Sequence, residues 1–117
     1  MRQNKRKEER EPCYGKLLFL NQEIPGYIRD ISENGMRVNV PRPFIPQVNP
    51  LDTYKVQILP EGEAVFEPFS AEIEIRWIRT DPLFTTIGAS LLGLEPGKEG
   101  AYNHLLELYR SHSSAEG

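Results

Sequence analysis

Two short polar stretches carry side chains suited to binding an anion or a nucleobase. The first is RKEER at positions 6–10, in which three residues separate Arg6 from Arg10. An arginine guanidinium offers paired N–H donors that match phosphate oxygens and the O6/N7 edge of guanine, and it also stacks on bases. Taken alone, the stretch is typical of a solvated charge run. Arg2 and Arg6 have the same spacing, so the register of the arginine pair stays open.

The second stretch is DISENG at positions 30–35. Its plainest interpretation is a turn in which Asp30 and Ser32 bond to nearby backbone groups. Asn34 and Gly35 would then close a hairpin, because both residues tolerate positive φ. Each stretch is therefore weak by itself, and a binding site is indicated only if the two lie together.

The other reactive side chains form no catalytic or metal-binding pattern. His104 and His112 both fall in the C-terminal segment, and Cys13 has no histidine near it in the sequence. We expect Cys13 to pack as a small apolar residue. Cysteines, histidines and carboxylates show no ligand spacing, and GKEG at 97–100 lacks the layout of a phosphate loop. The sequence predicts no catalytic residue, no metal and no enzyme activity.

Charge is unevenly distributed along the chain. The net charge is −3, but the first ten residues hold five basic and two acidic side chains, a balance of +3 that leaves −6 for the rest. A general nucleic-acid binder usually presents a basic face. An acidic body with a basic leading arm instead indicates either a small anionic partner that is held locally or no anionic partner at all.

Length and composition fit one folded domain. With 117 residues, 38% hydrophobic and 26% charged, the chain can bury a core without staples. There is no apolar run long enough for a membrane span, and the basic start has no apolar stretch behind it, so we expect no secretory leader. A single cysteine cannot form an internal disulfide. We therefore expect a cytoplasmic protein.

The elements that must hold the polar stretches are short strands. Prolines and glycines divide the chain, and the predicted strands are 13–20, 25–31, 36–40, 53–59, 69–79 and 84–94. The segment 41–50 holds four prolines and cannot be a central strand. In the fifth strand, alternation predicts one core-facing set: Ala71, Ile73, Ile75 and Trp77.

After Pro96 and Gly97 the apolar period changes. Four residues then follow a helical spacing and predict an amphipathic helix of about 14 residues: Tyr102, Leu105, Leu106 and Tyr109. We expect 113–117 to be a disordered tail. Six strands and one helix predict a mainly β fold, either a small antiparallel barrel or a sandwich. The helix would cover an open barrel end or pack on another subunit.

The ordered pair of motifs resembles the PilZ domain, a family of bacterial receptors for cyclic di-GMP. An Arg-x3-Arg is followed about twenty residues later by Asp-x-Ser-x-x-Gly, and the matching residues are Arg6, Arg10, Asp30, Ser32 and Gly35. The stretches PGYIRDISENGMRV and EIEIRWIR with TIGASLL also resemble family strands, so the likeness covers nearly the whole chain. Asn34 and Leu91 depart from the family, which often has glycine and phenylalanine there. The spacing favours the Arg6/Arg10 register.

The resemblance implies a six-stranded antiparallel β-barrel of the split PilZ type with a C-terminal α-helix over 13–112. It implies that Arg6 and Arg10 hold a phosphate or a guanine edge and stack on a base. Asp30 would accept from guanine N1 and N2, Ser32 would bridge to the ligand or set the turn, and Gly35 would allow close backbone approach. Further candidates for the site are Arg2, Lys5, Asn34 and Arg79.

The resemblance also implies a function. A receptor of this kind binds cyclic di-GMP without catalysis, and its arm, 1–12, would wrap over the barrel mouth when the ligand binds. We expect a monomer or weak dimer that regulates a separate protein in motility, biofilm or exopolysaccharide production, with no nucleic acid, membrane insertion or other cofactor. One alternative is a PilZ-fold interaction module that binds a protein through its helix and no nucleotide. A nucleic-acid-binding barrel is the other, and the acidic body disfavours it.

Overall fold

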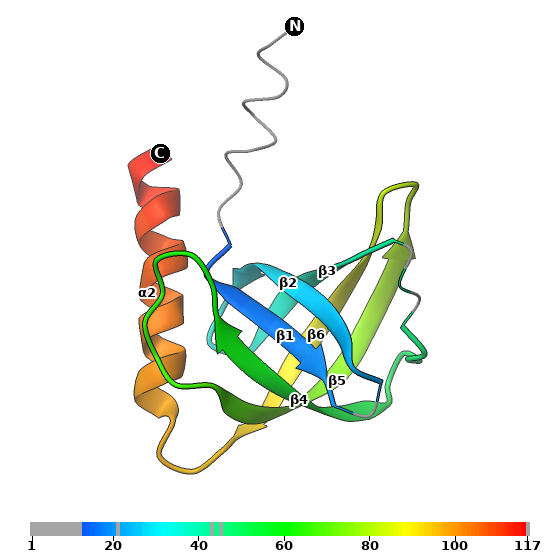
Figure 1. The fold of residues 1–117 in the computed structure, drawn as a ribbon, viewed down its shortest axis with the longest axis horizontal. Helices are drawn as coiled ribbons and strands as arrows, with labels where there is room; N and C mark the ends of the chain where they lie inside the picture. The colour runs from blue at the N-terminus through cyan, green and yellow to red at the C-terminus, as the bar shows by residue number, and fades with distance from the viewer. Residues whose placement is uncertain (1–12, 21, 43, 45, 117) are drawn as a thin grey trace, which may run out of the picture.

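The computed structural model describes residues 13–20, 22–42, 44 and 46–116, with side chains as far as Ser111. Within these residues the chain forms a closed antiparallel barrel with strand order β1-β2-β3-β6-β5-β4, followed by a helix (Figure 1). The elements are β1 (Gly15–Phe19), β2 (Ile24–Ile31), β3 (Gly35–Pro41), β4 (Thr53–Pro60), β5 (Phe69–Thr80), β6 (Phe84–Leu94) and α2 (Glu99–Glu116). The predicted fold class, a six-stranded antiparallel barrel with a C-terminal helix, is confirmed.

The arginine pair lies outside the described residues. Arg2, Lys5, Arg6 and Arg10 all belong to the segment 1–12, which the structure does not describe. Their roles, and the predicted wrapping of the arm, remain predictions from the sequence. The first described residues, Cys13 and Tyr14, lead directly into β1.

Barrel closure rests on the shortest strand. β1 has five residues and pairs with β2 on one side and with β4 on the other, so the sheet has no free edge at this point. The proline-containing segment 41–50 follows β3 and lies outside the strands after Pro41, as predicted. The chain then crosses to β4, so β3 takes the distant β6 as its second neighbour.

The core follows the alternation of the strands. Inward side chains of β1 and β3 are buried at every second position. The largest fully buried side chains come from all six strands and the helix: Phe19, Phe69, Leu17, Ile28, Ile58, Ile73, Ile75, Ile87, Leu105, Val38, Val40 and Val56. Burying one such side chain stabilises the fold by about 1.5–3 kcal/mol.

Helix α2 covers the barrel end at which β1, β3 and β5 begin (Figure 1). The four apolar residues at helical spacing are all buried, as predicted: Tyr102, Leu105, Leu106 and Tyr109. The helix has 18 residues and runs to Glu116, so its backbone includes 113–116, which we expected to lie in a disordered tail. No helix in the described part of the chain is both long and apolar enough to cross a membrane.

Bulges on β2 and β5 change which face their side chains occupy, and β6 carries a further register shift opposite Glu72 and Ile73. The pairing of β2 with β3 shifts between Ile28 and Asp30, and the pairing of β5 with β6 shifts between Ile75 and Trp77. Each bulge places one extra residue on one strand, so two successive side chains point outward. Asp30 is therefore exposed, and Trp77 has 41% of its surface exposed.

The bulge in β5 corrects one prediction. Ala71, Ile73 and Ile75 face the core as expected. Trp77 does not join them, because the alternation that places these residues inward is interrupted at Arg76. The indole instead lies on the outer wall of the barrel.

Candidate ligand-binding site

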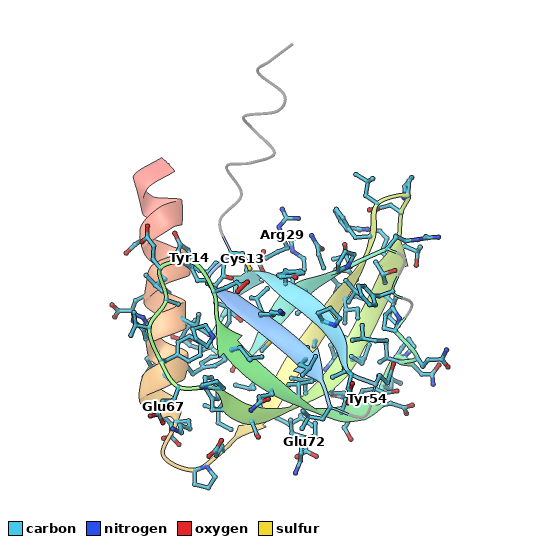
Figure 2. All side chains as sticks on the ribbon, in the orientation of Figure 1. Cys13, Tyr14, Arg29, Tyr54, Glu67 and Glu72 are labelled. Atoms are coloured by element: carbon cyan, nitrogen blue, oxygen red, sulfur yellow. The ribbon has the colours of Figure 1, made fainter. Side chains whose placement is uncertain are left out.

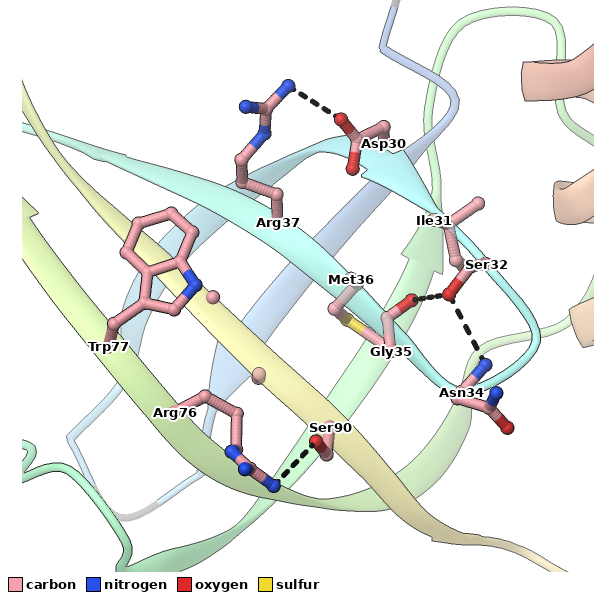
Figure 3. A pocket seen from close by; sticks show the side chains of 12 residues that line it. Asp30, Ile31, Ser32, Asn34, Gly35, Met36, Arg37, Arg76, Trp77 and Ser90 are labelled. Atoms are coloured by element: carbon pink, nitrogen blue, oxygen red, sulfur yellow. Dashed lines mark hydrogen bonds and ion pairs between the residues drawn. The ribbon is translucent and has the colours of Figure 1, made fainter.

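A pocket of about 470 Å³ opens on the outer wall of the barrel, beside the turn between β2 and β3 (Figure 3). Its walls come from that turn and from β2, β3, β5 and β6. The lining residues are Asp30, Ile31, Ser32, Asn34, Gly35, Met36, Arg37, Arg76, Trp77, Gly88, Ala89 and Ser90.

One row of residues crosses the pocket from strand to strand. Asp30 on β2 is opposite Arg37 on β3, and Arg37 is opposite Gly88 on β6. Gly88 is in turn opposite Trp77 on β5. Adjacent strands lie about 4.8 Å apart, so the row spans about 14 Å. It places a carboxylate at one end, an indole at the other and a guanidinium between them.

Gly88 leaves room for the indole. A Cβ atom at this position would overlap the Trp77 ring, so the indole lies against the backbone of β6 where no side chain intervenes. The Arg79 guanidinium lies 5.5 Å from the centre of the Trp77 ring, a cation–π distance. Arg79, a further sequence candidate, therefore supports the indole and is not itself among the residues that line the pocket.

Asp30 is paired with Arg37. Arg37 Nη2 donates to Asp30 Oδ2 at 2.6 Å, and the two side chains are 43% and 55% exposed. Figure 3 shows the Arg37 side chain directed toward Asp30 and away from Trp77. The Arg37 Nε atom is buried and has no hydrogen-bond partner among the described residues. The guanidinium is thus only partly satisfied.

Ser32 organises the turn. Its hydroxyl donates to the Gly35 carbonyl at 3.4 Å and accepts from the Asn34 N–H at 3.3 Å, while its backbone N–H donates to the same carbonyl at 2.8 Å. The hydroxyl is exposed and sets the turn, which is one of the two roles expected for it.

Gly35 is required for a different reason from the one the sequence indicates. Neither Asn34 nor Gly35 is among the described residues with positive φ, so the predicted conformation of the turn is wrong. A Cβ atom at Gly35 would overlap the carbonyl oxygen of Ala89 on β6. Gly35 begins β3 and pairs with Ser90, and this close approach of two backbones excludes a side chain.

A second arginine borders the pocket. Arg76, the other outward residue of the β5 bulge, donates from Nη1 to the Ser90 hydroxyl at 3.4 Å and lies 3.6 Å from Glu74 Oε1. The Arg76 side chain has 55% of its surface exposed. Arg37 and Arg76 therefore bring two positive charges to the pocket, against the one carboxylate of Asp30.

Helix α2 is hydrogen-bonded to the turn that borders the pocket. The Tyr102 hydroxyl donates to the Ser32 carbonyl at 2.7 Å, and Arg110 Nη2 lies 3.1 Å from Glu33 Oε2. Burial raises the pKa of the Tyr102 phenol above its ordinary value, so the hydroxyl stays a donor in the alkaline range where an exposed tyrosine would ionise. A movement of the turn would therefore change the hydrogen bonds that hold α2.

The helix is also bonded to the chain that leads into β1. The Tyr109 hydroxyl donates to the Ile28 carbonyl at 2.6 Å and accepts from the backbone N–H groups of Tyr14 at 2.9 Å and Gly15 at 3.3 Å. Figure 2 shows Cys13 and Tyr14 at the end of the barrel that α2 covers. Tyr109 therefore joins α2, the start of β1 and the strand that carries Asp30.

The structure gathers only part of the predicted site. Asp30, Ser32, Asn34 and Gly35 all line the pocket. The basic arm that carries the predicted arginines lies outside the described residues. The sequence reasoning missed the other eight lining residues: Ile31, Met36, Arg37, Arg76, Trp77, Gly88, Ala89 and Ser90. Their one sequence signal is a glycine in the middle of a strand, which often marks a close approach.

The described residues include no group of three or more histidine, cysteine, aspartate or glutamate side chains that could hold a metal ion. A comparison with family models finds a match to the PilZ domain over residues 2–108, which includes both motifs and most of the chain. A comparison with curated proteins finds no match.

Proposed function

Because the chain belongs to the PilZ domain family of cyclic di-GMP receptors, we propose that it binds cyclic di-GMP at the pocket beside the β2–β3 turn and has no catalytic activity. The observation that carries this proposal is the row across the pocket, with Asp30 at one end and the exposed indole of Trp77 at the other. A ligand that fits this row has hydrogen-bond donors, a flat ring and negative charge.

Cyclic di-GMP has these three properties. Its guanines carry N1–H and N2–H donors, which the Asp30 carboxylate can accept. A guanine ring can stack on the exposed face of Trp77, and such stacking contributes about 1–3 kcal/mol per base. Its two phosphates suit arginine, and Arg76 lies on the same wall with its guanidinium half exposed.

The arm would complete the site. Arg10 is four residues before Tyr14, and Tyr14 is bonded through the Tyr109 hydroxyl to Ile28, two residues before Asp30. Four extended residues reach at most about 14 Å. A link of this length would allow Arg10 to approach the Asp30 end of the pocket. Arg6 would follow it to a phosphate or to the second guanine.

The magnitudes require both motifs. Micromolar binding needs about 8 kcal/mol at the 1 M standard state. A hydrogen bond to a charged group contributes only about 1.5–3 kcal/mol, so two phosphate contacts by the arm fall short. Adding the guanine contacts of Asp30 and stacking on Trp77 brings the sum into range.

The proposed output is a change at the end of the barrel that α2 covers. Ligand binding would draw the arm over the pocket and bring the ligand into contact with the turn to which Tyr102 is hydrogen-bonded. The surface formed by the arm, the turn and α2 would then differ between the free and bound protein. We propose that a separate protein in motility, biofilm or exopolysaccharide production recognises this difference, in the bacterial cytoplasm.

Fluorescence of the single tryptophan gives a direct test. Titration with cyclic di-GMP should quench Trp77, and calorimetry should give the same affinity. Asp30→Ala and Arg10→Ala should each weaken binding by at least about tenfold, the equivalent of one lost hydrogen bond of about 1.4 kcal/mol. The matched controls are Glu72→Ala and Arg42→Ala, which remove the same charges at exposed positions outside the pocket.

Two results would contradict the proposal. One is no heat and no quenching at tens of micromolar ligand. The other is unchanged affinity in both Asp30→Ala and Arg10→Ala, which would place any binding elsewhere. A complex with a partner protein that forms without cyclic di-GMP and is insensitive to it, seen by sedimentation, would favour the interaction module instead.

A further inference from the structure

Arg37 is hydrogen-bonded to the Asp30 carboxylate, which is the group that a guanine of the ligand would need. We propose that Arg37 is a switch residue: cyclic di-GMP displaces it from Asp30, and the freed guanidinium then binds a phosphate of the same ligand. This inference rests on the proposed function and adds to it a residue outside both sequence motifs. The carrying observations are the 2.6 Å contact between Arg37 Nη2 and Asp30 Oδ2 and the buried, unpartnered Nε of the same guanidinium.

The two donors that compete for Asp30 are chemically alike. Guanine presents N1–H and N2–H from a single N–C–N unit, which has the donor geometry of a guanidine. Arg37 carries the same N–C–N unit, and one of its nitrogens, Nη2, donates to the same carboxylate. Adenine has no donor at N1 and no amino group at C2, so it cannot offer Asp30 this pair of adjacent donors. The Arg37–Asp30 pair therefore acts as a filter for guanine.

The contact in the free protein is weak enough to be exchanged. Both side chains are about half exposed, at 43% and 55%, and exposed ion pairs contribute little to stability. Of the five N–H groups of Arg37, the Nε–H is buried without a partner in the described residues, which is unfavourable. A rotamer that leaves Asp30 would give this donor an acceptor on the ligand.

The geometry leaves a place for the displaced side chain. Arg37 lies in the middle of the row, with Asp30 on one side and Gly88 on the other. The indole of Trp77 covers Gly88, but Arg37 itself lines the open pocket, so its guanidinium can turn from Asp30 into that space without a change in its backbone. That backbone is held on both edges, because β3 pairs with β2 and with β6. Only side-chain torsions need to change.

The switch predicts opposite effects for two ligands. Guanosine carries the guanine edge but no phosphate, so for guanosine Arg37 is only a competitor. Cyclic di-GMP carries both groups, so the guanidinium that its guanine displaces can bind one of its phosphates. Arg37→Met should therefore weaken cyclic di-GMP binding by about tenfold, one charge-assisted hydrogen bond. The same variant should bind guanosine at least as tightly as the wild type.

The experiment measures both affinities in four proteins: the wild type, Arg37→Met, Arg37→Lys and the control Arg42→Met. Cyclic di-GMP is titrated by calorimetry and guanosine by chemical-shift changes at millimolar concentration. Arg37→Lys keeps a charge that can reach a phosphate, so its affinity for cyclic di-GMP should lie between those of the wild type and Arg37→Met. Arg42 is exposed and outside the pocket, so its variant should match the wild type for both ligands.

Three outcomes overturn the switch while leaving the proposed function intact. Equal weakening of both ligands by Arg37→Met would mean that Arg37 only orients Asp30. Unchanged binding of both would mean that Arg37 takes no part, and tighter binding of both would make it a competitor that never reaches a phosphate. Wild-type protein that fails to bind cyclic di-GMP would overturn the proposed function itself, and the switch with it.

Discussion

The Tyr109 hydroxyl joins three segments of the chain, and its removal should destabilise the protein. In Tyr109→Phe the Ile28 carbonyl loses a donor at 2.6 Å, and the N–H groups of Tyr14 and Gly15 lose an acceptor at 2.9 and 3.3 Å. A buried polar group left unpaired costs about 1–3 kcal/mol. Because the Gly15 contact is long and the Tyr14 amide is only partly buried, we expect a total loss of about 3 kcal/mol.

The loss in free energy of unfolding can be measured as a decrease in Tm. The entropy of unfolding is about 2.1 cal/mol/K per residue, or about 250 cal/mol/K for a chain of this length, so about 3 kcal/mol lowers Tm by about 12 °C. The matched control is Tyr54→Phe, whose hydroxyl accepts from the Asn49 N–H at 3.1 Å in an exposed position. Water can replace that hydroxyl, so Tm should fall by no more than about 4 °C, the equivalent of about 1 kcal/mol.

The pH dependence of stability gives a second readout of the same hydroxyl. Burial raises the pKa of Tyr109 above its ordinary value of 10.0. Above about pH 10 the unfolded chain loses this phenolic proton while the folded chain keeps it, so stability falls as pH rises. Tyr109→Phe should lose stability less steeply than the wild type above that pH. A loss of Tm equal to that of Tyr54→Phe, with an unchanged alkaline slope, would refute the reasoning.

Three further variants or reagents probe single positions. Gly88→Ala should displace the Trp77 indole, because the added Cβ overlaps the ring; a red-shifted emission and a loss of about 1–3 kcal/mol are expected, and unchanged fluorescence would contradict this. Leu51 follows Pro50 and has a φ of 73°, in a turn closed by a hydrogen bond from the Asp52 N–H to the Asn49 carbonyl. Glycine adopts this backbone conformation without strain, so Leu51→Gly should raise the free energy of unfolding by about 0.5–1 kcal/mol. A lower free energy of unfolding in urea would contradict this prediction. Burial raises the pKa of the Cys13 thiol, so at pH 8 a disulfide reagent should react with the native protein at least about tenfold more slowly than with the unfolded chain, and equal rates would show that the thiol is accessible.

The barrel and the helix could be predicted because their core positions repeat regularly. The last strand, 84–94, agrees with its predicted bounds, and the other strands end within two residues of theirs. Period-two burial in the strands and helical spacing at Tyr102 and Tyr109 are direct consequences of facing one core. The four prolines between 41 and 50 likewise keep that segment out of the sheet after Pro41.

The pocket could be predicted only in part, because the sequence of a single strand does not determine which residues lie opposite it on the neighbouring strands. Arg37 becomes a site residue by standing opposite Asp30 on one side and Gly88 on the other. The alternation through Ile75 gives no sign that the pairing shifts before Trp77. For Gly35 the sequence indicated a turn with positive φ and close backbone approach to a ligand, whereas the structure places the Ala89 carbonyl, 54 positions away in the sequence, where a side chain would lie.

Both ends of the proposed recognition row depend on a bulge. A regular β2 that keeps Ile28 in the core would also turn Asp30 inward, and a regular β5 would bury Trp77 beside Ile75. In each strand the extra residue shifts the period by one, so a side chain that the core alternation would bury reaches the outer wall. Because β3 and β6 pair in regular register between them, the acid and the indole are held at a fixed separation of three strand spacings. The rigidity of the barrel therefore sets the distance between the two groups that would read the ligand, and the side chain of Arg37 is the part of the row that is free to move.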